Sequence, residues 1–428
     1  MKNNFIQCTL KDIASIEKGS IISGPFGSNI SSKFFQESGV PVIRGNNLSN
    51  SCIKFIDNGF AYLTEEKANE LNAYAIKDDL LFTAAGTIGQ VGIIEKNTKF
   101  EKYVISNKQL RVRLNIEKIN PLYAYYWFSS PWMVKDIVNK NTGSTVPLIN
   151  LGIIKSLEIK LPKERITQDK IAAVLSALDS KIELNNRINT ELEAMAKTLY
   201  DYWFVQFEFP DKDGKPYKTS GGKMVWNEEL KRDIPDCWHN GTASNMFHFN
   251  PSLFLPKNKI ASYIDMNSLP LVGFMTKKPE RKIFNGGVKF QNGDVSIARI
   301  TPCLENGKTG LVTLLEEDEV GFGSTEFIII RGKGRALSGF AAYLGRSDSF
   351  RQFAISNMTG TSGRKRIDAK VLETYSLAIP SETILDLFEF TVESFFKQMT
   401  NNSKESEDLT QLRDWLLPML MNGQVMVN

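Results

Sequence analysis

The chain has 428 residues, of which 42% are hydrophobic and 23% charged, values ordinary for a soluble globular protein of two or three domains. No apolar run reaches the ~18 residues that a membrane-spanning helix needs. The polar N-terminus MKNNFIQCTLKD does not resemble a signal peptide, so we expect a cytoplasmic protein. Four scattered cysteines (Cys8, Cys52, Cys237 and Cys303) lack CxxC spacing and predict reduced thiols.

The net charge of +4 conceals an alternation along the chain. Basic residues exceed acidic ones by 5 over residues 1–162 and by 6 over 237–380. Acidic residues are in excess by 2 over 163–236 and by 5 over 381–428. Basic blocks suit a polyanion such as DNA, because neutralised phosphates release counterions. Excesses of this size also arise by chance, so charge alone leaves both interpretations open.

Residues 1–162 predict a first globular domain of short strands between turns that contain Gly and Asn. Polar side chains gather at three of these turns, in VIRGNNL (42–48), ISNKQL (105–110) and NTGSTV (141–146). Side chains of these types read base edges or bind phosphates, although Asn and Ser also favour ordinary turns. The candidates for DNA contact are Arg44, Asn46, Asn47, Lys108, Gln109, Thr142, Ser144 and Thr145.

Residues 163–209 predict a long helix, because residues 166–204 contain almost no Gly or Pro. Apolar residues recur at 171, 175, 178, 182, 192, 195, 199 and 202, alternating steps of four and three that form a heptad seam. The polar stretch 210–236, punctuated by Gly and Pro, predicts a surface connector.

Residues 237–380 repeat the first domain at an offset of about 217 residues. SNMTGTSGRKRIDAKVLETYSLAIP (356–380) aligns with NKNTGSTVPLINLGIIKSLEIKLP (139–162), and ASYIDMNSLP (261–270) aligns with VPVIRGNNLS (40–49). The second set of DNA candidates comprises Arg299, Lys308, Ser324, Thr325, Thr361, Ser362, Arg364, Lys365 and Arg366. An internal salt bridge is an equal alternative for Arg299 and Lys308, and an exposed basic turn is the alternative for the cations at 364–366.

Residues 381–428 predict a second long helix that matches the first. Adding 217 to the eight seam positions lands on apolar residues each time, from Phe388 to Met419. One polar seam position is shared, at Asn185 and Asn402. If the helices pack antiparallel about their midpoints, these two amides face each other and set the register. The alternative is a solvent-filled break in the seam.

The chain lacks the motifs of catalysis. Gly307-Lys308-Thr309 comes closest to a phosphate-binding loop, but Pro302 stands where that loop needs Gly. The two histidines, His239 and His248, have no Cys, Asp or Glu cluster at metal-ligand spacing. We therefore expect a non-catalytic protein without a metal or cofactor of its own.

This order of domain, helix, connector, domain and helix resembles the specificity subunit of type I restriction–modification systems over nearly the whole chain. The resemblance rests on SGPFGSNISSKFF (23–35), RITPCLENGKTGLV (299–312), QDKIAAVLSALDSKIELNNRINTELEAMAKTLYDYWFVQFEF (168–209) and YKTSGGKMVWNEELKRDIPDCW (217–238). The opening of the second domain, residues 240–259, departs from it by lacking a GPFGS-like string.

The resemblance implies an α+β fold with two target recognition domains, 1–162 and 237–380. The helices at 163–209 and 381–428 would pair as an antiparallel coiled coil. Each domain would bind one half of a gapped, asymmetric duplex DNA target. The partners would be two modification (methyltransferase) subunits and two restriction subunits, which would carry S-adenosylmethionine, ATP and Mg²⁺. A helix of ~36 residues, about 54 Å long, fits half-sites about one DNA turn apart.

Three alternatives remain from sequence: the recognition subunit of another gapped-site methylation system, a scaffold without DNA affinity, and a self-contained methyltransferase or nuclease. The last is disfavoured by the missing cofactor loop.

Overall fold

The computed structural model describes residues 5–49, 53–361, 363–425 and 427. The chain forms two compact units, and each is described by itself. Unit 1 comprises Met1–Lys181 and Leu409–Asn428, and unit 2 comprises Ile182–Asp408. Two long helices, α6 (Arg165–Tyr200) and α11 (Glu382–Asn422), contribute residues to both units. No helix among the described residues is long and apolar enough to cross a membrane.

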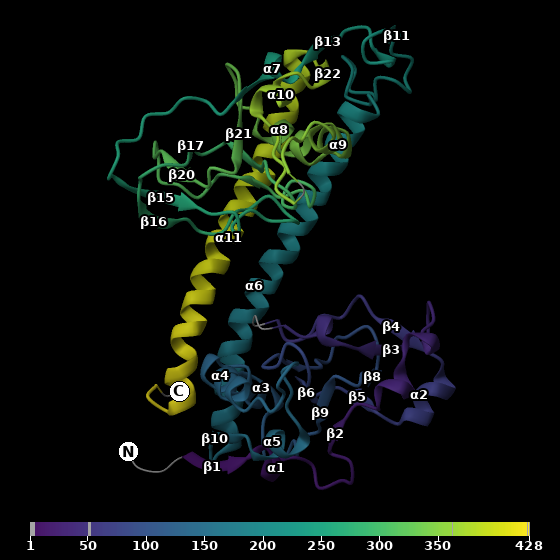
Figure 1. Cartoon of the computed structure of the whole chain (residues 1–428), viewed down its shortest axis with the longest axis vertical. Helices are drawn as coiled ribbons and strands as arrows, with labels where there is room; N and C mark the ends of the chain where they lie inside the picture. The colour runs from purple at the N-terminus through teal and green to yellow at the C-terminus, as the bar shows by residue number, and fades with distance from the viewer. Residues whose placement is uncertain (1–4, 50–52, 362, 426, 428) are drawn as a thin grey trace. The chain divides into compact units, whose positions relative to one another are not determined.

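Unit 1 contains two four-stranded sheets (Figure 1). The first has the order β2 (Ile21–Ser23), β9 (Gln109–Val112), β6 (Leu80–Thr83), β7 (Val91–Ile93), and its neighbours are antiparallel. The second has the order β4 (Ala61–Leu63), β3 (Val40–Ile43), β8 (Lys102–Ile105), β5 (Tyr74–Ile76), with β3 and β8 parallel. A separate pair joins β1 (Phe5–Thr9) to β10 (Glu158–Pro162).

The helices of unit 1 are α1 (Leu10–Ile13), α2 (Glu65–Leu71), α3 (Pro121–Phe128), α4 (Pro131–Asn139) and α5 (Leu151–Ser156), with 3-10 turns η1 (Gly27–Ile30), η2 (Ser32–Phe34) and η3 (Gly45–Asn47). Of these, α1, α3, α4 and α5 share a core with the first sheet, α6 and α11, whereas α2 and the turns η1 and η2 pack with the second sheet. The side chain of Asn120 caps α3, and Pro121 occupies its first turn. Tyr125, Tyr126 and Trp127 are buried in one core with the α6 and α11 segments, so these aromatic residues pack and do not stack on bases.

Unit 2 repeats this architecture strand for strand. One sheet has the order β14 (Phe247–Phe249), β21 (Phe327–Gly332), β18 (Val295–Ala298), β19 (Thr309–Leu311). The other has the order β16 (Glu280–Ile283), β15 (Ile260–Ile264), β20 (Gly321–Gly323), β17 (Val288–Phe290), with β15 and β20 parallel. β13 (His239–Thr242) pairs with β22 (Ser376–Ile379) as β1 pairs with β10.

The remaining elements of unit 2 are short helices and the connector. The helices are α7 (Ala243–Met246), α8 (Ser338–Arg346), α9 (Asp348–Ser356) and α10 (Ala369–Glu373). The π-helical turn η4 (Asp201–Val205) follows α6, and the connector holds the strand pair β11 (Met224–Asn227) and β12 (Arg232–Pro235).

A buried ion pair is conserved between the two repeats. In unit 1 Arg113 donates two hydrogen bonds to Asp79, at 3.0 and 2.9 Å. In unit 2 Arg331 donates two to Asp294, both at 2.6 Å. Asp79 directly precedes β6 and Arg113 directly follows its partner strand β9; Asp294 likewise precedes β18, and Arg331 lies near the end of its partner strand β21. The internal repeat predicted from sequence is therefore confirmed at the level of strand order and side-chain pairing.

The long helices α6 and α11 pair antiparallel, as predicted (Figure 1). In unit 1 Arg413 donates to Asp179 at 3.0 Å, and in unit 2 Asn189 lies beside Met399 and Ser403. Residue numbers thus fall along α11 as they rise along α6.

In the second half of each helix the predicted heptad seam is wrong at Met195, Tyr202 and Leu412, whereas Leu192, Leu199 and Leu416 pack against the cores. Met195 is 56% exposed and Leu412 is 42% exposed, whereas Ala196 and Arg413 are buried in their places. Tyr202 is also exposed. The shift is identical in the two repeats, because 196 and 413 are again 217 apart. A helix with 3.6 residues per turn drifts against a 3.5-residue repeat, so the neighbouring position takes the buried place.

The polar layer between the helices also differs from prediction. Asn185 and Asn402 are both buried, and the Asn185 amide donates to the backbone carbonyl of Asn402 at 3.4 Å rather than to its side chain. The Asn402 side chain donates to Asn189 at 2.8 Å, and Asn185 also donates to Glu405 at 2.8 Å. Asn189, four residues beyond Asn185 on α6, therefore also lies opposite Asn402. The layer is polar, as the sequence indicates, with a different set of partners.

Candidate nucleic-acid interface

Four loops of unit 1 come together at one edge of its sheets, and we call residues 44–48, 83–90, 106–109 and 141–148 loop face 1. The backbone joins them: Ala84 N donates to Lys108 O at 2.8 Å, and Gly86 N donates to Pro147 O at 2.9 Å. The Gln90 side chain donates to Leu48 O at 2.9 Å. The three groups of candidates in the first domain therefore belong to one surface.

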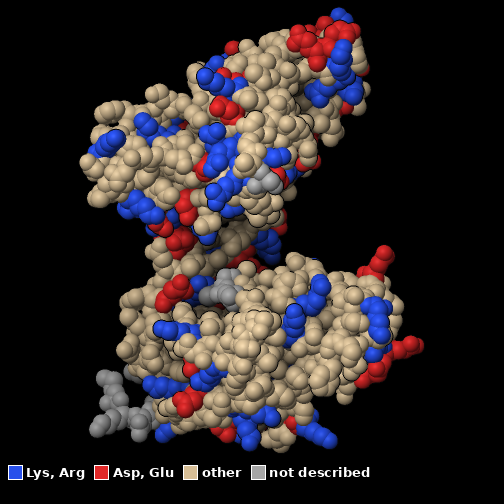
Figure 2. Space-filling model, viewed as in Figure 1, with Lys and Arg blue, Asp and Glu red and all other residues tan. Residues whose placement is uncertain are grey.

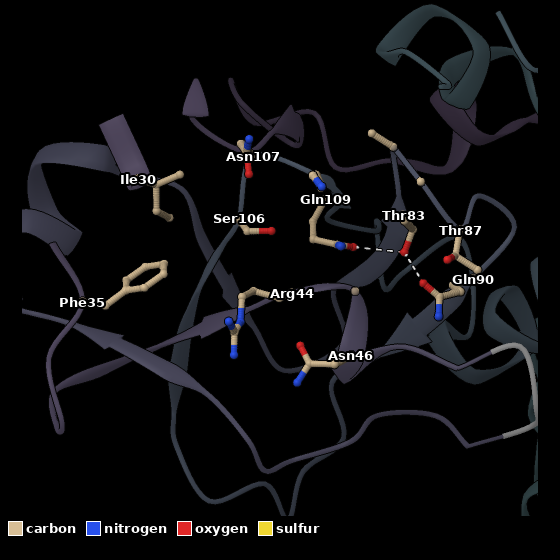
Figure 3. Close-up of a pocket in the computed structure, with 14 residues that line it drawn as sticks. Ile30, Phe35, Arg44, Asn46, Thr83, Thr87, Gln90, Ser106, Asn107 and Gln109 are labelled. Atoms are coloured by element: carbon tan, nitrogen blue, oxygen red, sulfur yellow. Dashed lines mark hydrogen bonds between the residues drawn. The ribbon is translucent and has the colours of Figure 1, made fainter. Parts of the chain in front are cut away.

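A pocket of about 500 Å³ opens within loop face 1 (Figure 3). Arg44, Asn46, Thr83, Gln90 and Gln109 are among its polar lining residues. Its other lining residues are Ile30, Phe35, Gly45, Ala85, Gly86, Thr87, Ser106, Asn107 and Lys108. Cations and amides within one hollow are suited to bind a polar, anionic ligand.

The candidates at residues 44–47 have unequal access. Arg44 is half-buried and donates to Gly59 O at 3.1 Å, while its Nε has no partner. Asn46 is exposed and donates to the same carbonyl at 3.3 Å. Asn47 is fully buried, with its amide bonded to the carbonyls of Ile56 and Asn58. Asn47 thus shapes the loop, and it would not reach DNA.

Lys108 and Gln109 also differ, since Lys108 is exposed and Gln109 is buried at the floor of the pocket. In the loop at 141–148, Asn141 Oδ1 accepts from Gly143 N and Leu148 N, and Thr142 bonds to Leu148 O at 3.1 Å. This closed loop presents Ser144 and Thr145 to solvent.

Unit 2 brings together the equivalent loops, and we call residues 265–268, 299–308, 324–326 and 359–366 loop face 2. Lys308 Nζ donates to Met266 O at 2.8 Å, and Thr301 N donates to Lys365 O at 3.1 Å. Ile300 and Arg366 form a β-bridge. The second group of candidates is therefore also one surface.

The strongest contact on loop face 2 is an ion pair that the sequence did not indicate. Arg366 Nη2 lies 2.7 Å from Glu326 Oε1, and its Nε lies 3.0 and 2.9 Å from the two carboxylate oxygens. These hydrogen bonds hold the pKa of Glu326 below its usual range. Arg364 and Lys365 are exposed, so they remain open to a phosphate.

The other candidates of loop face 2 have mixed surroundings. Arg299 is half-buried beside Glu326, and its Nε has no partner. Lys308 is half-buried and donates a hydrogen bond to the Met266 carbonyl. This contact is internal, but it is not the internal salt bridge that the sequence offered as an alternative. Ser324 accepts from Glu326 N at 3.1 Å, while Thr325 and Thr361 are exposed. Ser362 lies outside the described residues.

The residues that sequence reasoning missed are Thr83, Thr87, Gln90, Asn107 and Glu326. Three of them could have been found from the sequence, because Gln90 and Asn107 flank the ends of predicted strands and Glu326 directly follows the candidates Ser324 and Thr325. On the face seen in Figure 2, Lys and Arg side chains are spread over the globular parts of both units. No group of three His, Cys, Asp or Glu among the described residues is placed to hold a metal ion.

Comparison with known proteins finds similarity to a single family. Residues 4–194 match the family described as Type I restriction modification DNA specificity domain. The chain is 25% identical to the Type I restriction enzyme MjaIX specificity subunit of Methanocaldococcus jannaschii, over 98% of this chain and 93% of that one. It is 21% identical to the HindI specificity subunit of Haemophilus influenzae, over 76% and 82%.

A solved structure shares the fold. The type I restriction–modification S subunit from M. genitalium is similar with a TM-score of 0.60 and 14% identity, over 97% of this chain and 96% of that one. The match in sequence, the two repeats and the antiparallel helix pair lead to one assignment. The chain is similar along nearly its whole length to specificity subunits of type I restriction–modification systems, and its residues 4–194 match their specificity domain.

Proposed function

We propose that the chain binds a gapped, asymmetric duplex DNA target, with loop face 1 on one half-site and loop face 2 on the other. One observation carries this proposal: two units of identical strand order bear loops of different chemistry. Loop face 1 is rich in amides, and loop face 2 is rich in arginine and lysine. A common fold with unlike contact residues suits two unlike half-sites, because bases are distinguished by side-chain donors and acceptors.

The proposed contacts follow from exposure. Positioning on phosphates is assigned to the exposed cations Lys108, Arg364 and Lys365. Base reading is assigned to half-buried or exposed groups at the pocket and loop rims: Arg44, Asn46, Ser144, Thr145, Arg299 and Thr325. Asn47 is given a structural role, since its amide is committed to backbone carbonyls.

We further propose two docked modification subunits, with restriction subunits joining them. S-adenosylmethionine, ATP and Mg²⁺ would be bound by these partners. This proposal is supported by two exposed apolar patches, one on each long helix, at positions that the 217-residue repeat relates to each other. Met195 and Leu199 lie beside Tyr202 on α6, in an almost wholly apolar shallow hollow, and Leu412 and Trp415 are exposed on α11. Two similar patches on one chain suit two copies of one partner.

The test is to co-express the chain with the modification subunit encoded beside it and to sequence the methylated bases of the host DNA. A gapped, asymmetric methylated motif that requires this chain is expected. Replacing residues 359–366 should alter one half of the motif and leave the other half unchanged. Methylation that persists without the chain, or a continuous palindromic motif, would favour a scaffold instead.

A further inference from the structure

The floor of the loop face 1 pocket is a buried polar pair whose hydrogen bonds are incomplete. Thr83 on β6 and Gln109 on β9 lie opposite each other and are 2% and 0% exposed. Thr83 Oγ1 donates to Gln90 Oε1 at 2.8 Å and lies 3.4 Å from Gln109 Oε1. Gln109 Nε2 has no partner. Turning the Gln109 amide over would let its nitrogen donate to Thr83 Oγ1, but its oxygen would then be unpaired in the place of the nitrogen.

Unit 2 shows that the fold does not need this polar pair. The register that places Thr83 opposite Gln109 places Ala298 opposite Phe327 in unit 2. The same position in the same sheet is therefore filled by two apolar side chains, both fully buried. Leaving a buried amide unpaired is destabilising. At this position only unit 1 has such an amide, which points to a ligand that completes its hydrogen bonds.

The walls of the pocket define the chemistry of that ligand. Phe35 and Ile30 give it an apolar side, and Figure 3 shows them across the hollow from Gln90 and Thr87. Arg44, Asn46 and Lys108 add polar groups and positive charge. A flat ring with a hydrogen-bonding edge, attached to a phosphate, satisfies all three features. The pocket volume of about 500 Å³ is sufficient for a nucleotide.

We propose that this pocket takes one nucleobase displaced from the DNA helix, with the Gln109 amide bonding to its edge. The inference rests on the proposed function, since the DNA must lie against loop face 1. A stacked base offers only its groove edge at the mouth of the pocket, whereas Gln109 lies among the residues that line it. In the proposed complex a displaced base enters the pocket, and the cost of unstacking is offset by hydrogen bonds and stacking within it.

Gly45 supplies a steric probe of the pocket. A Cβ built on Gly45 would lie 3.9 Å from both Gln109 Nε2 and Gln90 Oε1, which is ordinary contact distance. Gly45→Ala therefore places a methyl group over the floor without a clash. Gln109→Leu removes the amide, and the pair Thr83→Ala with Gln109→Phe copies the apolar pair of unit 2.

The experiment places 2-aminopurine at each position of the target in turn and measures its fluorescence on binding to the chain with its modification subunit. We expect an increase at one base that is not methylated, lost in Gly45→Ala and in Gln109→Leu. Arg364→Ala, on loop face 2, is the matched control and should keep the increase once lower salt restores binding. An increase confined to methylated bases, or one that persists in Gly45→Ala, would overturn the inference. Absence of any salt-dependent duplex binding would instead refute the proposed function.

Discussion

The Glu326–Arg366 pair sets a limit on how much of the positive charge of loop face 2 is available to DNA. The side chains are 24% and 43% exposed, so solvent screens the pair and its contribution to stability is small. Glu326→Gln removes the negative charge and releases Arg366. We expect duplex affinity to rise by about 1.4- to 5-fold from the released pairing.

The salt dependence gives a second, independent magnitude. One further phosphate contact steepens the slope of log affinity against log salt by about 0.9, equal to about 3.5-fold between 50 and 200 mM. The assay is fluorescence anisotropy with a non-target duplex across that salt range. Arg364→Ala is the control, and its slope should become shallower by about the same amount. If Glu326→Gln leaves the slope unchanged, Arg366 does not bind phosphate and the reasoning is refuted.

Three further predictions concern the helices. Asn189 and Asn402 share a buried hydrogen bond, so a double-mutant cycle with alanine in urea unfolding should give about 1 kcal/mol of coupling, and additivity would contradict it. Burial raises the pKa of the Glu389 carboxyl to about 7, above its value in the unfolded chain. The protonated carboxyl therefore contributes its full share of the unfolding free energy below pH ~4.5, and this share is lost as the pH rises through ~7. Glu389→Gln should flatten that loss of stability with pH, and an unchanged pH profile of unfolding would contradict the prediction. Met195→Lys or Trp415→Lys should reduce the number of bound modification subunits from two to one in native mass spectrometry, without lowering the melting temperature, and an unchanged stoichiometry would exclude these patches.

The sequence determined the repeat and the helices. Residue spacing carries this information, because apolar residues at matching positions 217 apart must occupy matching places in two copies of one fold. It also indicated the turns at which polar side chains gather. Each of the three turns in the first domain proved to belong to loop face 1, and their counterparts to loop face 2.

Only the tertiary structure decided which of those side chains are exposed and which are buried or paired with another residue. Asn47 is the same residue type as its neighbour Asn46, yet Asn47 is buried and Asn46 exposed; likewise Gln109 is buried and the adjacent Lys108 exposed. Arg366 has the same local composition as Arg364, and only the folded chain brings Glu326, 40 residues away, against it. Hydrogen bonds between residues far apart in the sequence depend on three-dimensional packing, and so does the choice of which helix positions become buried. Residue spacing does not determine either of them.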